Sequence, residues 1–223
     1  MKVIVSTGPS FEPIDEVRRL TNFSTGELGV LLANRLTASG CQVFCLKGVG
    51  ATYAGALHTP HHLPFTTNQD LHDHLVELSR SHSIQALFHV AALCDFKVQQ
   101  VEDAHGQAQA SAKIDSRVSG LTLHLEPAKK IISGLRALFP AAVLVGWKYE
   151  LAGTPPEALA KAVRQMQENR TDACVLNGQA YGSGFAFCRP TQPILECRNK
   201  TELVQFLTTW LAETLRRPVA CVR

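Results

Sequence analysis

The sequence predicts an α/β protein built on an open, mostly parallel β-sheet with helices on both faces and a small hairpin or flap region. Short apolar runs alternate along the chain with longer segments in which leucine recurs at helical spacing. Apolar residues make up 45% of the 223 residues and charged residues 18%, which is typical of a globular protein. No internal repeat and no linker divides the chain, so we expect a single domain over residues 1–223.

Strands are predicted where short apolar runs end in turn residues. The first covers residues 2–6 and stops at a Thr-Gly-Pro turn. Further strands are expected at residues 41–46, 86–90, 121–125, 142–146 and 173–176. Two late runs, residues 185–188 and 194–197, are expected to pair as a hairpin.

The first helix is predicted to follow Gly26, because leucines from Leu28 to Leu36 recur at helical spacing and Gly40 closes the pattern. Four more helices are expected at residues 68–82, 129–138, 155–169 and 200–215. Two stretches lack a clear period. One is rich in Gly, Pro and His, runs to about residue 67 and is predicted to be a loop. The other, residues 97–120, is polar, as functional or mobile segments often are.

This alternation of strands and helices is typical of a Rossmann-like sheet, in which ligands bind beyond the carboxyl ends of the strands. That rule selects four segments: residues 7–29, 91–97, 146–150 and 177–184. The first is the most informative. It joins a strand to a helix through about twenty residues, whereas an ordinary connection of this kind has about 2–6.

Charge and hydropathy exclude several classes of partner. The formal net charge is only +3, too small a bias to indicate nucleic acid or an anionic membrane surface. No apolar run approaches the ~20 residues of a membrane-spanning helix, and the apolar stretch at the amino terminus is far shorter than a secretory signal. We therefore expect a cytoplasmic location.

The cysteines and histidines show no metal-site spacing. Seven cysteines stand at positions 41, 45, 94, 174, 188, 197 and 221, without a C-x-x-C pair. Most lie in apolar runs and are expected to be reduced and buried. His58, His61 and His62 cluster, but no carboxylate or cysteine completes a ligand set, so a solvated loop is favoured. We expect no metal site among the side chains.

The start of the first helix predicts an anion site. Ser24, Thr25 and Gly26 stand where unpaired backbone N–H groups and the positive end of the helix dipole face a ligand. Simple N-capping explains the same three residues equally well. Arg18 and Asn22, a few residues upstream, make the combination more specific.

The run of residues 12–29, E-P-I-D-x-V-R-x-x-T-N-x-S-T-G-x-x-G, resembles the phosphopantothenoylcysteine synthetase family. The resemblance continues in family order over nearly the whole chain. It includes the segments Ala91–Phe96, Ala112–Ser116, Leu144–Lys148 and Val175–Asn177. No decarboxylase segment precedes these motifs, so the resemblance is to a stand-alone synthetase.

The resemblance implies a ligase of coenzyme A biosynthesis. In that reaction the carboxylate of 4′-phosphopantothenate attacks the α-phosphate of CTP or ATP, with Mg²⁺, and pyrophosphate leaves. The amine of cysteine then attacks the acyl nucleotidylate. Repulsion among the anionic groups must be offset by Mg²⁺, cationic side chains and helix N-termini. Members of this family are dimers, so a homodimer is expected by analogy.

The resemblance also assigns catalytic roles. Asn22 matches the asparagine that engages the acyl group; the alternative is a helix-capping turn residue. Arg18 matches an arginine near the same site, with an ion pair to Asp15 or Glu12 as the alternative. Lys113 matches the flap lysine that reaches the α-phosphate, and is otherwise a solvated lysine of a polar loop.

A further set matches the nucleotide-binding positions of the family. It consists of Gly8, Ser24, Thr25, Gly26, Ala91, Ala92, Asp95, Lys148 and Asn177. Gly8 and Gly26 would border phosphates through their N–H groups. For Asp95 an Asx turn or a helix cap is the alternative, and for Lys148 simple solvation.

Some positions depart from the family pattern. Pro9 stands where a second glycine is usual, and brings no N–H donor. Gly178 follows Asn177 where aspartate is frequent, and Trp147 and Tyr149 are bulkier than usual. Pro9 and Gly178 leave open a non-catalytic nucleotide-binding homologue. A nicotinamide-dependent oxidoreductase is less favoured, because no G-x-G-x-x-G follows the first strand.

Overall fold

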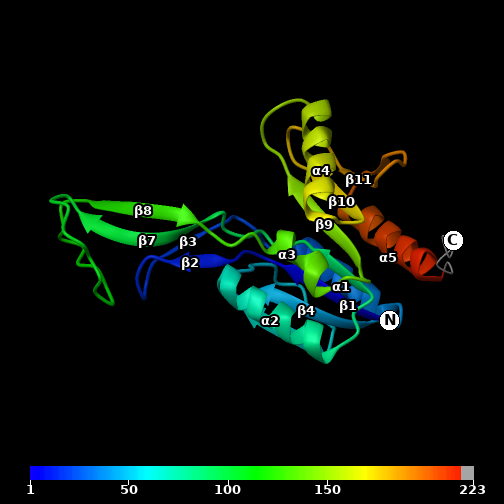
Figure 1. The fold of residues 1–223 in the computed structure, drawn as a ribbon, viewed down its shortest axis with the longest axis horizontal. Helices are drawn as coiled ribbons and strands as arrows, with labels where there is room; N and C mark the ends of the chain where they lie inside the picture. Colours follow the sequence, from blue (N-terminus) through cyan, green and yellow to red (C-terminus); the bar gives the residue numbers. More distant parts are fainter. Residues whose placement is uncertain (217–223) are drawn as a thin grey trace.

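The computed structural model describes residues 1–216. Its centre is an eight-stranded sheet in the order β12-β11-β10-β9-β6-β1-β4-β5 (Figure 1). The strands of this sheet are β1 (Lys2–Thr7), β4 (Gln42–Gly48), β5 (His61–Phe65), β6 (Ala86–His89), β9 (Val143–Tyr149), β10 (Ala173–Asn177), β11 (Phe185–Cys188) and β12 (Leu195–Cys197). The first six in sheet order from β5 to β10 are parallel, and β11 and β12 add an antiparallel edge.

The parallel part has the strand order of a doubly wound nucleotide-binding sheet. The chain places β4 and then β5 on one side of β1, and β6, β9 and β10 on the other. The strand order therefore reverses between β1 and β6, which form a parallel pair with Ser6 opposite His89. In such sheets the crevice at this switch point is where ligands bind.

Helices cover both faces of the sheet. α1 (Glu27–Ala38) and α5 (Lys200–Arg216) lie on one face, and α2 (Asn68–Ser81), α3 (Ile131–Leu138) and α4 (Pro155–Asn169) on the other. Alternate residues of β1 serve the two cores: Val3 and Val5 pack under α1 and α5, and Ile4 packs under α2 and α3. All three are fully buried, as the side-chain alternation of a strand between two helix layers requires.

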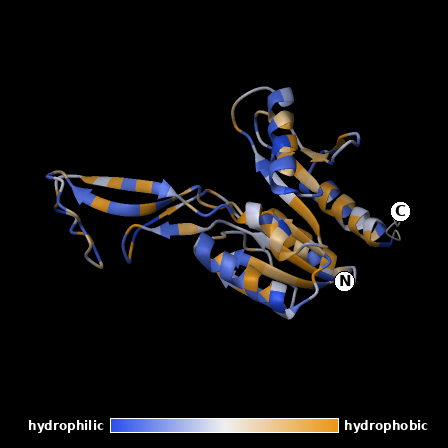
Figure 2. Cartoon of the chain, viewed as in Figure 1, coloured by the Kyte–Doolittle hydropathy of each residue, from blue (hydrophilic) through white to orange (hydrophobic). Residues whose placement is uncertain are grey.

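Two hairpins form an arm that extends away from the sheet (Figure 1). We call residues 11–21 and 96–127 the arm. Its strands are β2 (Phe11–Pro13), β3 (Arg19–Thr21), β7 (Phe96–Asp103) and β8 (Leu121–Pro127). β2 pairs with β3, β7 pairs with β8, and β2 lies against β7. Hydrophobic and hydrophilic residues alternate along β8, and along β7 on either side of a register shift between Val98 and Gln100, so one face of the long hairpin is apolar (Figure 2).

The predicted fold class is confirmed, including the flap region and the pairing of residues 185–188 with 194–197. Two predictions are wrong. Residues 61–65, placed in a loop, form the edge strand β5, and residues 97–103, the start of the polar stretch 97–120 that lacks a clear period, form most of β7. The third helix begins at Ile131 rather than at residue 129.

The six cysteines between Cys41 and Cys197 are unbridged and buried. Cys221 lies outside the described residues. Over residues 1–216, no helix combines the length and the apolar composition needed to cross a membrane.

Candidate functional site

The loops that follow β1 and β6 are joined directly at the switch point. The N–H of Ala92 donates to the carbonyl of Gly8 at 3.0 Å, and the N–H of Ser10 donates to the carbonyl of Ala92 at 3.1 Å. Pro9 and Ala92 therefore form a parallel bridge beyond the strands. This bridge does not require an N–H group from Pro9, because Ser10 and Ala92 supply both hydrogen-bond donors.

The loop after β4 packs against the loop that follows β1 and against the start of α1. Ala51 lies so close to Gly8 and Gly26 that a Cβ on either glycine would stand 2.8 Å and 3.0 Å from the Cβ of Ala51. Gly26 is also the N-cap of α1, with φ of 77°, and no side chain bonds to the cap. Thr25 Oγ1 accepts only the N–H of Glu27, at 3.3 Å. The predicted glycines and the amino end of α1 therefore meet beside the β1 loop.

Asn22 contacts the loop that carries Ala91, Ala92 and Asp95. Its Nδ2 donates to the carbonyl of Leu93 at 2.8 Å, while the residue stays exposed. The neighbouring Cys94 N–H donates to Ser10 Oγ at 2.9 Å. Both bonds fix the loop from the side of β1. The side chain of Asp95 is left exposed at the surface of a rigid segment.

Asn68 ties the same loop to the base of the arm, and sequence reasoning missed it. Its Nδ2 donates to the carbonyl of Cys94 at 2.8 Å and to that of Lys129 at 3.2 Å. Asn68 is 3% exposed, and its Oδ1 has no partner among the described residues. Its backbone N–H donates to the buried carboxylate of Glu12 at 3.4 Å. The sequence gives no signal for these contacts, because the cap at Thr67 marks only the start of the helix at Asn68.

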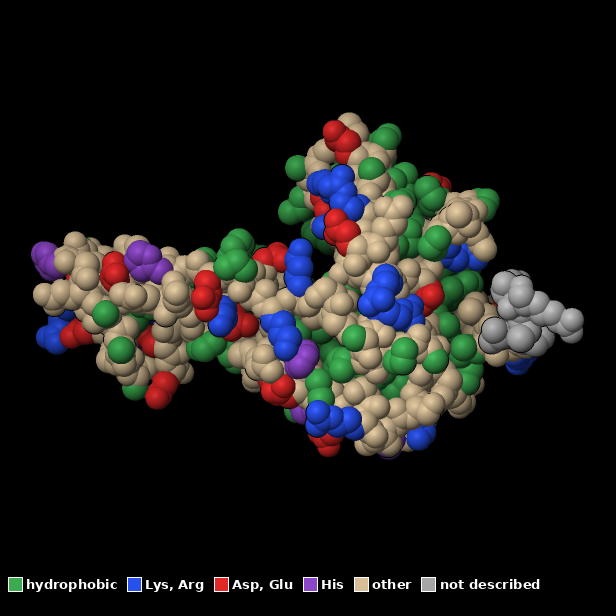
Figure 3. Space-filling model, in the orientation of Figure 1, with side chains coloured by type: hydrophobic (Ala, Val, Ile, Leu, Met, Phe, Trp, Pro, Cys, Tyr) green, Lys and Arg blue, Asp and Glu red, His purple; other side chains and the backbone are tan. Residues whose placement is uncertain are grey.

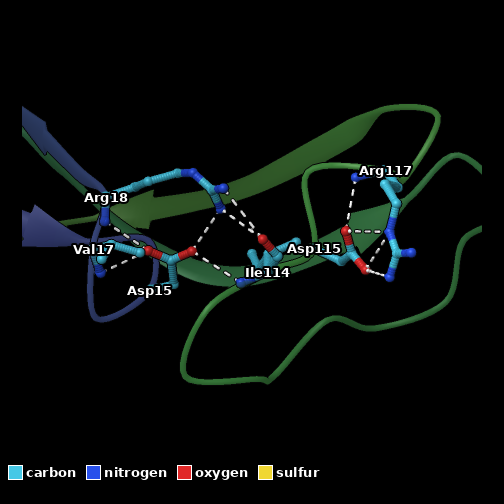
Figure 4. Close-up of polar contacts among 6 residues, drawn as sticks. All are labelled: Asp15, Val17, Arg18, Ile114, Asp115 and Arg117. Atoms are coloured by element: carbon cyan, nitrogen blue, oxygen red, sulfur yellow. Dashed lines mark hydrogen bonds and ion pairs between the residues drawn. The ribbon is translucent and has the colours of Figure 1, made fainter.

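Arg18 and Lys113 lie in the arm. Arg18 Nη1 donates to Asp15 Oδ2 at 2.7 Å, so the ion pair considered as the alternative for Arg18 is present (Figure 4). Both Nη atoms also approach the carbonyl of Ile114, at 3.3 and 3.2 Å. Lys113 is exposed next to that contact.

Asp15 is ionised more readily than an ordinary aspartate. Burial raises its pKa, but hydrogen bonds from the N–H groups of Val17, Ile114 and Arg18, with the charge of Arg18, lower it further, and the net direction is down.

Lys148 and Asn177 stand at the carboxyl ends of the adjacent strands β9 and β10. Lys148 Nζ lies 3.1 Å from Glu150 Oε1, and Lys161 of α4 binds the other oxygen of that carboxylate. Burial raises the pKa of Glu150, but the two lysines lower it more, so it stays ionised. One carboxylate shared by two ammonium groups leaves a net positive charge beside Asn177. Sequence reasoning missed Glu150 and Lys161.

The backbone conformation and the close packing at position 178 explain why glycine stands there. Its φ is 116°, and a Cβ there would stand 2.3 Å from the carbonyl oxygen of Glu150. The turn after β10 is held by hydrogen bonds between Glu150 and both Asn177 and Ala180, at 2.9 and 3.1 Å. A side chain does not fit, so the local packing requires glycine at this position.

The predicted residues fall into two groups. Those at the strand ends are Gly8, Asn22, Ser24, Thr25, Gly26, Ala91, Ala92, Asp95, Lys148 and Asn177. Arg18 and Lys113 form the second group, in the arm, which Figure 1 shows extending away from the strands. A cavity of about 730 Å³ contains none of them, because it opens near Met1 at the opposite ends of the strands. Within residues 1–216, no three His, Cys, Asp or Glu side chains are grouped to hold a metal ion.

The family model of the DNA/pantothenate metabolism flavoprotein C-terminal domain matches residues 1–217. A bifunctional coenzyme A biosynthesis protein, CoaBC of Thermococcus kodakarensis, is 27% identical over 183 residues, which are 82% of this chain and 42% of that protein. The chain thus spans about two fifths of the length of this relative.

Solved structures share the fold. The DNA/pantothenate metabolism flavoprotein of Streptococcus pneumoniae superposes with a TM-score of 0.84 at 23% identity, over 96% of this chain and 99% of that one. A mutant of Cab2 in complex with phosphopantothenate-cysteine gives a TM-score of 0.70 at 16% identity, over 97% and 89% of the two chains. With the family model matching almost every residue, the chain belongs to the family of the DNA/pantothenate metabolism flavoprotein C-terminal domain.

Proposed function

We propose that this chain is a phosphopantothenate–cysteine ligase, which joins 4′-phosphopantothenate to cysteine through an acyl nucleotidylate made from CTP or ATP. The observation that carries the proposal is the convergence at the switch point. Asn22, Gly8, Gly26 and the loop of Asp95 come from separate parts of the sequence and meet beyond β1 and β6. This is where a doubly wound sheet binds nucleotides.

The charges of the site suit a reaction among anions. The amino end of α1 presents backbone N–H groups, and its acidic residue Glu27 is paired with Lys200. Lys148 and Lys161 add positive charge near Asn177. Mg²⁺ would arrive with the triphosphate as part of the substrate. These groups would offset the repulsion between the phosphopantothenate carboxylate and the α-phosphate.

Asn22 is proposed to hold the acyl group by donating from its neutral amide. Asn22→Asp keeps the size of the side chain but removes the donor and adds a negative charge. The variant should release pyrophosphate once and then accumulate the acyl nucleotidylate, detectable by mass spectrometry. Turnover equal to the unchanged protein would refute the role.

Asn34→Asp provides the matched control for this experiment. Asn34 makes the same kind of contact, from Nδ2 to the carbonyl of Ala56 at 2.8 Å, on the far part of α1. Its substitution should leave the release of pyrophosphate and of the nucleoside monophosphate unchanged. If both variants stall alike, the effect belongs to the fold and not to the acyl group.

The apolar face of the arm supports the expected homodimer. Phe96, Leu125 and Leu121 are 49%, 43% and 41% exposed on the β7–β8 hairpin, and hydrophobic side chains are visible along the arm in Figure 3. A two-stranded hairpin is only marginally stable alone in water, so burial of this apolar face against another surface would stabilise the arm. A second copy of the chain would supply one, and would bring Arg18 and Lys113 to the strand ends of its neighbour.

Mixing two inactive variants tests this arrangement. Arg18→Ala changes the arm, and Asn22→Asp changes the strand-end region. If the arm of one copy serves the other, a mixed dimer contains one intact site, and an equal mixture should regain about one quarter of the original activity. No recovery after subunit exchange would place both residues in the same copy's site. A monomer by sedimentation would exclude the dimer.

The choice of nucleotide is open to direct measurement. Thermal shift with CTP and with ATP, each with Mg²⁺, should show stabilisation by the true co-substrate. Pyrophosphate release in the presence of phosphopantothenate, cysteine and each triphosphate then tests catalysis. Binding without release under any combination would identify a non-catalytic nucleotide-binding homologue, and the ligase proposal would fail.

A further inference from the structure

We propose that Asp15 is a positioning residue that holds Lys113 and Arg18 in one fixed geometry for the ligase reaction. This inference rests on the proposed function, because the proposed function gives Lys113 and Arg18 their roles in catalysis. Asp15 lies in the turn between β2 and β3, and its side chain is only 1% exposed. A carboxylate this well covered on a narrow arm must be satisfied by its neighbours.

The two carboxylate oxygens of Asp15 accept hydrogen bonds from different sets of donors. Oδ1 accepts the N–H groups of Val17 and Arg18 at 2.9 and 2.6 Å, which stabilises the local turn. Oδ2 accepts Arg18 Nη1 at 2.7 Å and the N–H of Ile114 at 3.2 Å. The second pair of contacts joins the turn to a segment about a hundred residues later in the sequence. Figure 4 shows the carboxylate between its two sets of donors.

The segment around Lys113 is bound on both sides. The carbonyl of Ala112 accepts the N–H of Glu16 at 2.9 Å. Ile114 is 1% exposed, donates its N–H to Asp15, and offers its carbonyl to both Nη atoms of Arg18. The backbone of Lys113 is therefore fixed between two anchored neighbours, while its side chain stays exposed. Such an arrangement aims a flexible lysine without using its ammonium group.

Asp15 orients Arg18 as well. Asp15 and the carbonyl of Ile114 occupy the Nη side of the guanidinium, whose side chain is 37% exposed. Among residues 1–216, Nε of Arg18 has no hydrogen-bond acceptor, so that edge of the guanidinium is open to an anionic ligand. The same carboxylate thus sets the direction of both cationic side chains of the arm.

Asp15→Asn separates the two tasks of the carboxylate. The amide keeps one oxygen, which can still accept the turn N–H groups. Its NH₂ group then faces two other donors, Arg18 and the N–H of Ile114, so the long-range contacts are lost. Asp115→Asn is the matched control. Asp115 lies in the same segment but pairs only with Arg117, an exposed neighbour (Figure 4).

The first measurement needs no substrate. A lysine-specific endoproteinase cuts after Lys113, and cutting requires that the flanking backbone leave its hydrogen bonds. Asp15→Asn should increase the rate of this cleavage at least tenfold, and Asp115→Asn should leave it within about twofold of the original. The remaining lysines serve as internal references. Equal rates in all three proteins would overturn the proposal.

The second measurement is steady-state pyrophosphate release. Asp15→Asn should lower kcat/KM at least tenfold with Asp115→Asn unchanged. Faster cleavage without a kinetic loss would overturn the positioning role. If the unchanged protein releases no pyrophosphate, the proposed function fails, and the cleavage experiment still decides whether Asp15 anchors the segment.

Arg18→Lys covers the case in which Asp15→Asn does not fold. Lysine retains the charge opposite Asp15 but loses the paired donors to the carbonyl of Ile114. Cleavage after Lys113 should then be faster than in the original protein. An unchanged cleavage rate in this variant would overturn the part of the proposal in which Asp15 acts on the segment through Arg18.

Discussion

Gly178 offers a sharp test of the packing at the end of β10. Gly178→Ala adds one methyl group in a backbone of φ 116°, where it would stand 2.3 Å from the carbonyl oxygen and 2.8 Å from the nitrogen of Glu150. Both atoms belong to the backbone, so they cannot swing away as a side chain would. The chain also offers a matched position. Gly182 has φ of 113°, and a Cβ there would meet nothing within 4 Å.

The two substitutions separate backbone strain from steric overlap. A side chain at such a φ costs about 1–3 kcal/mol at either position. Overlap with fixed backbone adds about 1–3 kcal/mol at Gly178 alone. We therefore expect Gly178→Ala to lower the free energy of unfolding by about 2 kcal/mol more than Gly182→Ala.

Urea unfolding followed by circular dichroism measures this difference. With a slope of about 2–3 kcal/mol per molar urea, the midpoint of Gly178→Ala should fall about 1 M below that of Gly182→Ala. Thermal shift with nucleotide adds a second readout, since displacement of Glu150 also displaces its partner Lys148. Equal midpoints for the two variants would refute the reasoning, and would show that the turn accommodates a side chain.

The remaining predictions concern two helix glycines and the buried His89. Gly29→Ala should destabilise by about 2 kcal/mol, because its Cβ would stand 2.2 Å from the Thr7 side chain. Gly134→Ala, in the open on α3, should stabilise by about 0.5–1 kcal/mol, and urea unfolding that ranks them otherwise would contradict the packing argument. Burial lowers the pKa of His89 from 6.5 to about 4, so the unfolded chain takes up a proton near pH 6.5 while the native chain stays neutral. Stability should fall by about 3 kcal/mol between pH 6.5 and 4 from this group. His89→Gln should flatten that dependence, and an unchanged slope in this variant would exclude the assignment.

The central sheet could be predicted from the sequence because helices cover both of its faces, and strands buried in this way are short apolar runs. Runs such as Val3–Val5 in β1 are apolar and fully buried, and the helices show a clear period. Edge and arm strands lack that signal. β5 contains Pro64 and two histidines, and an edge strand tolerates them because it pairs only with β4. In β7 a register shift between Val98 and Gln100 breaks the alternation of apolar residues, so the strand looked irregular.

The positions of the candidate residues in the fold were predictable as far as single residues carry recognisable chemistry, while their roles stay predictions. Gly8 and Asp95 follow β1 and β6, whose carboxyl ends share one edge of the sheet, so the topology rule places them together, and Asn22 reaches the same loop from the end of the arm strand β3. Contacts between distant segments were not predictable. Nothing near Asp15 in the sequence indicates that Ile114 is its partner, and Asn68 resembles any residue that follows a helix cap. Such pairings depend on tertiary geometry, which no local period reports.

One hydrogen bond of 2.8 Å, from the N–H of Ala128 to the carbonyl of Asp95, closes the base of the β7–β8 hairpin. The chain leaves the body of the protein and returns to it at nearly the same point, so the sheet keeps its register whatever lies between. Such an insert can lengthen, shorten or be exchanged during evolution without disturbing the pairing of the central strands. The way in which copies of this fold associate can therefore diverge while the framework of the central sheet stays unchanged.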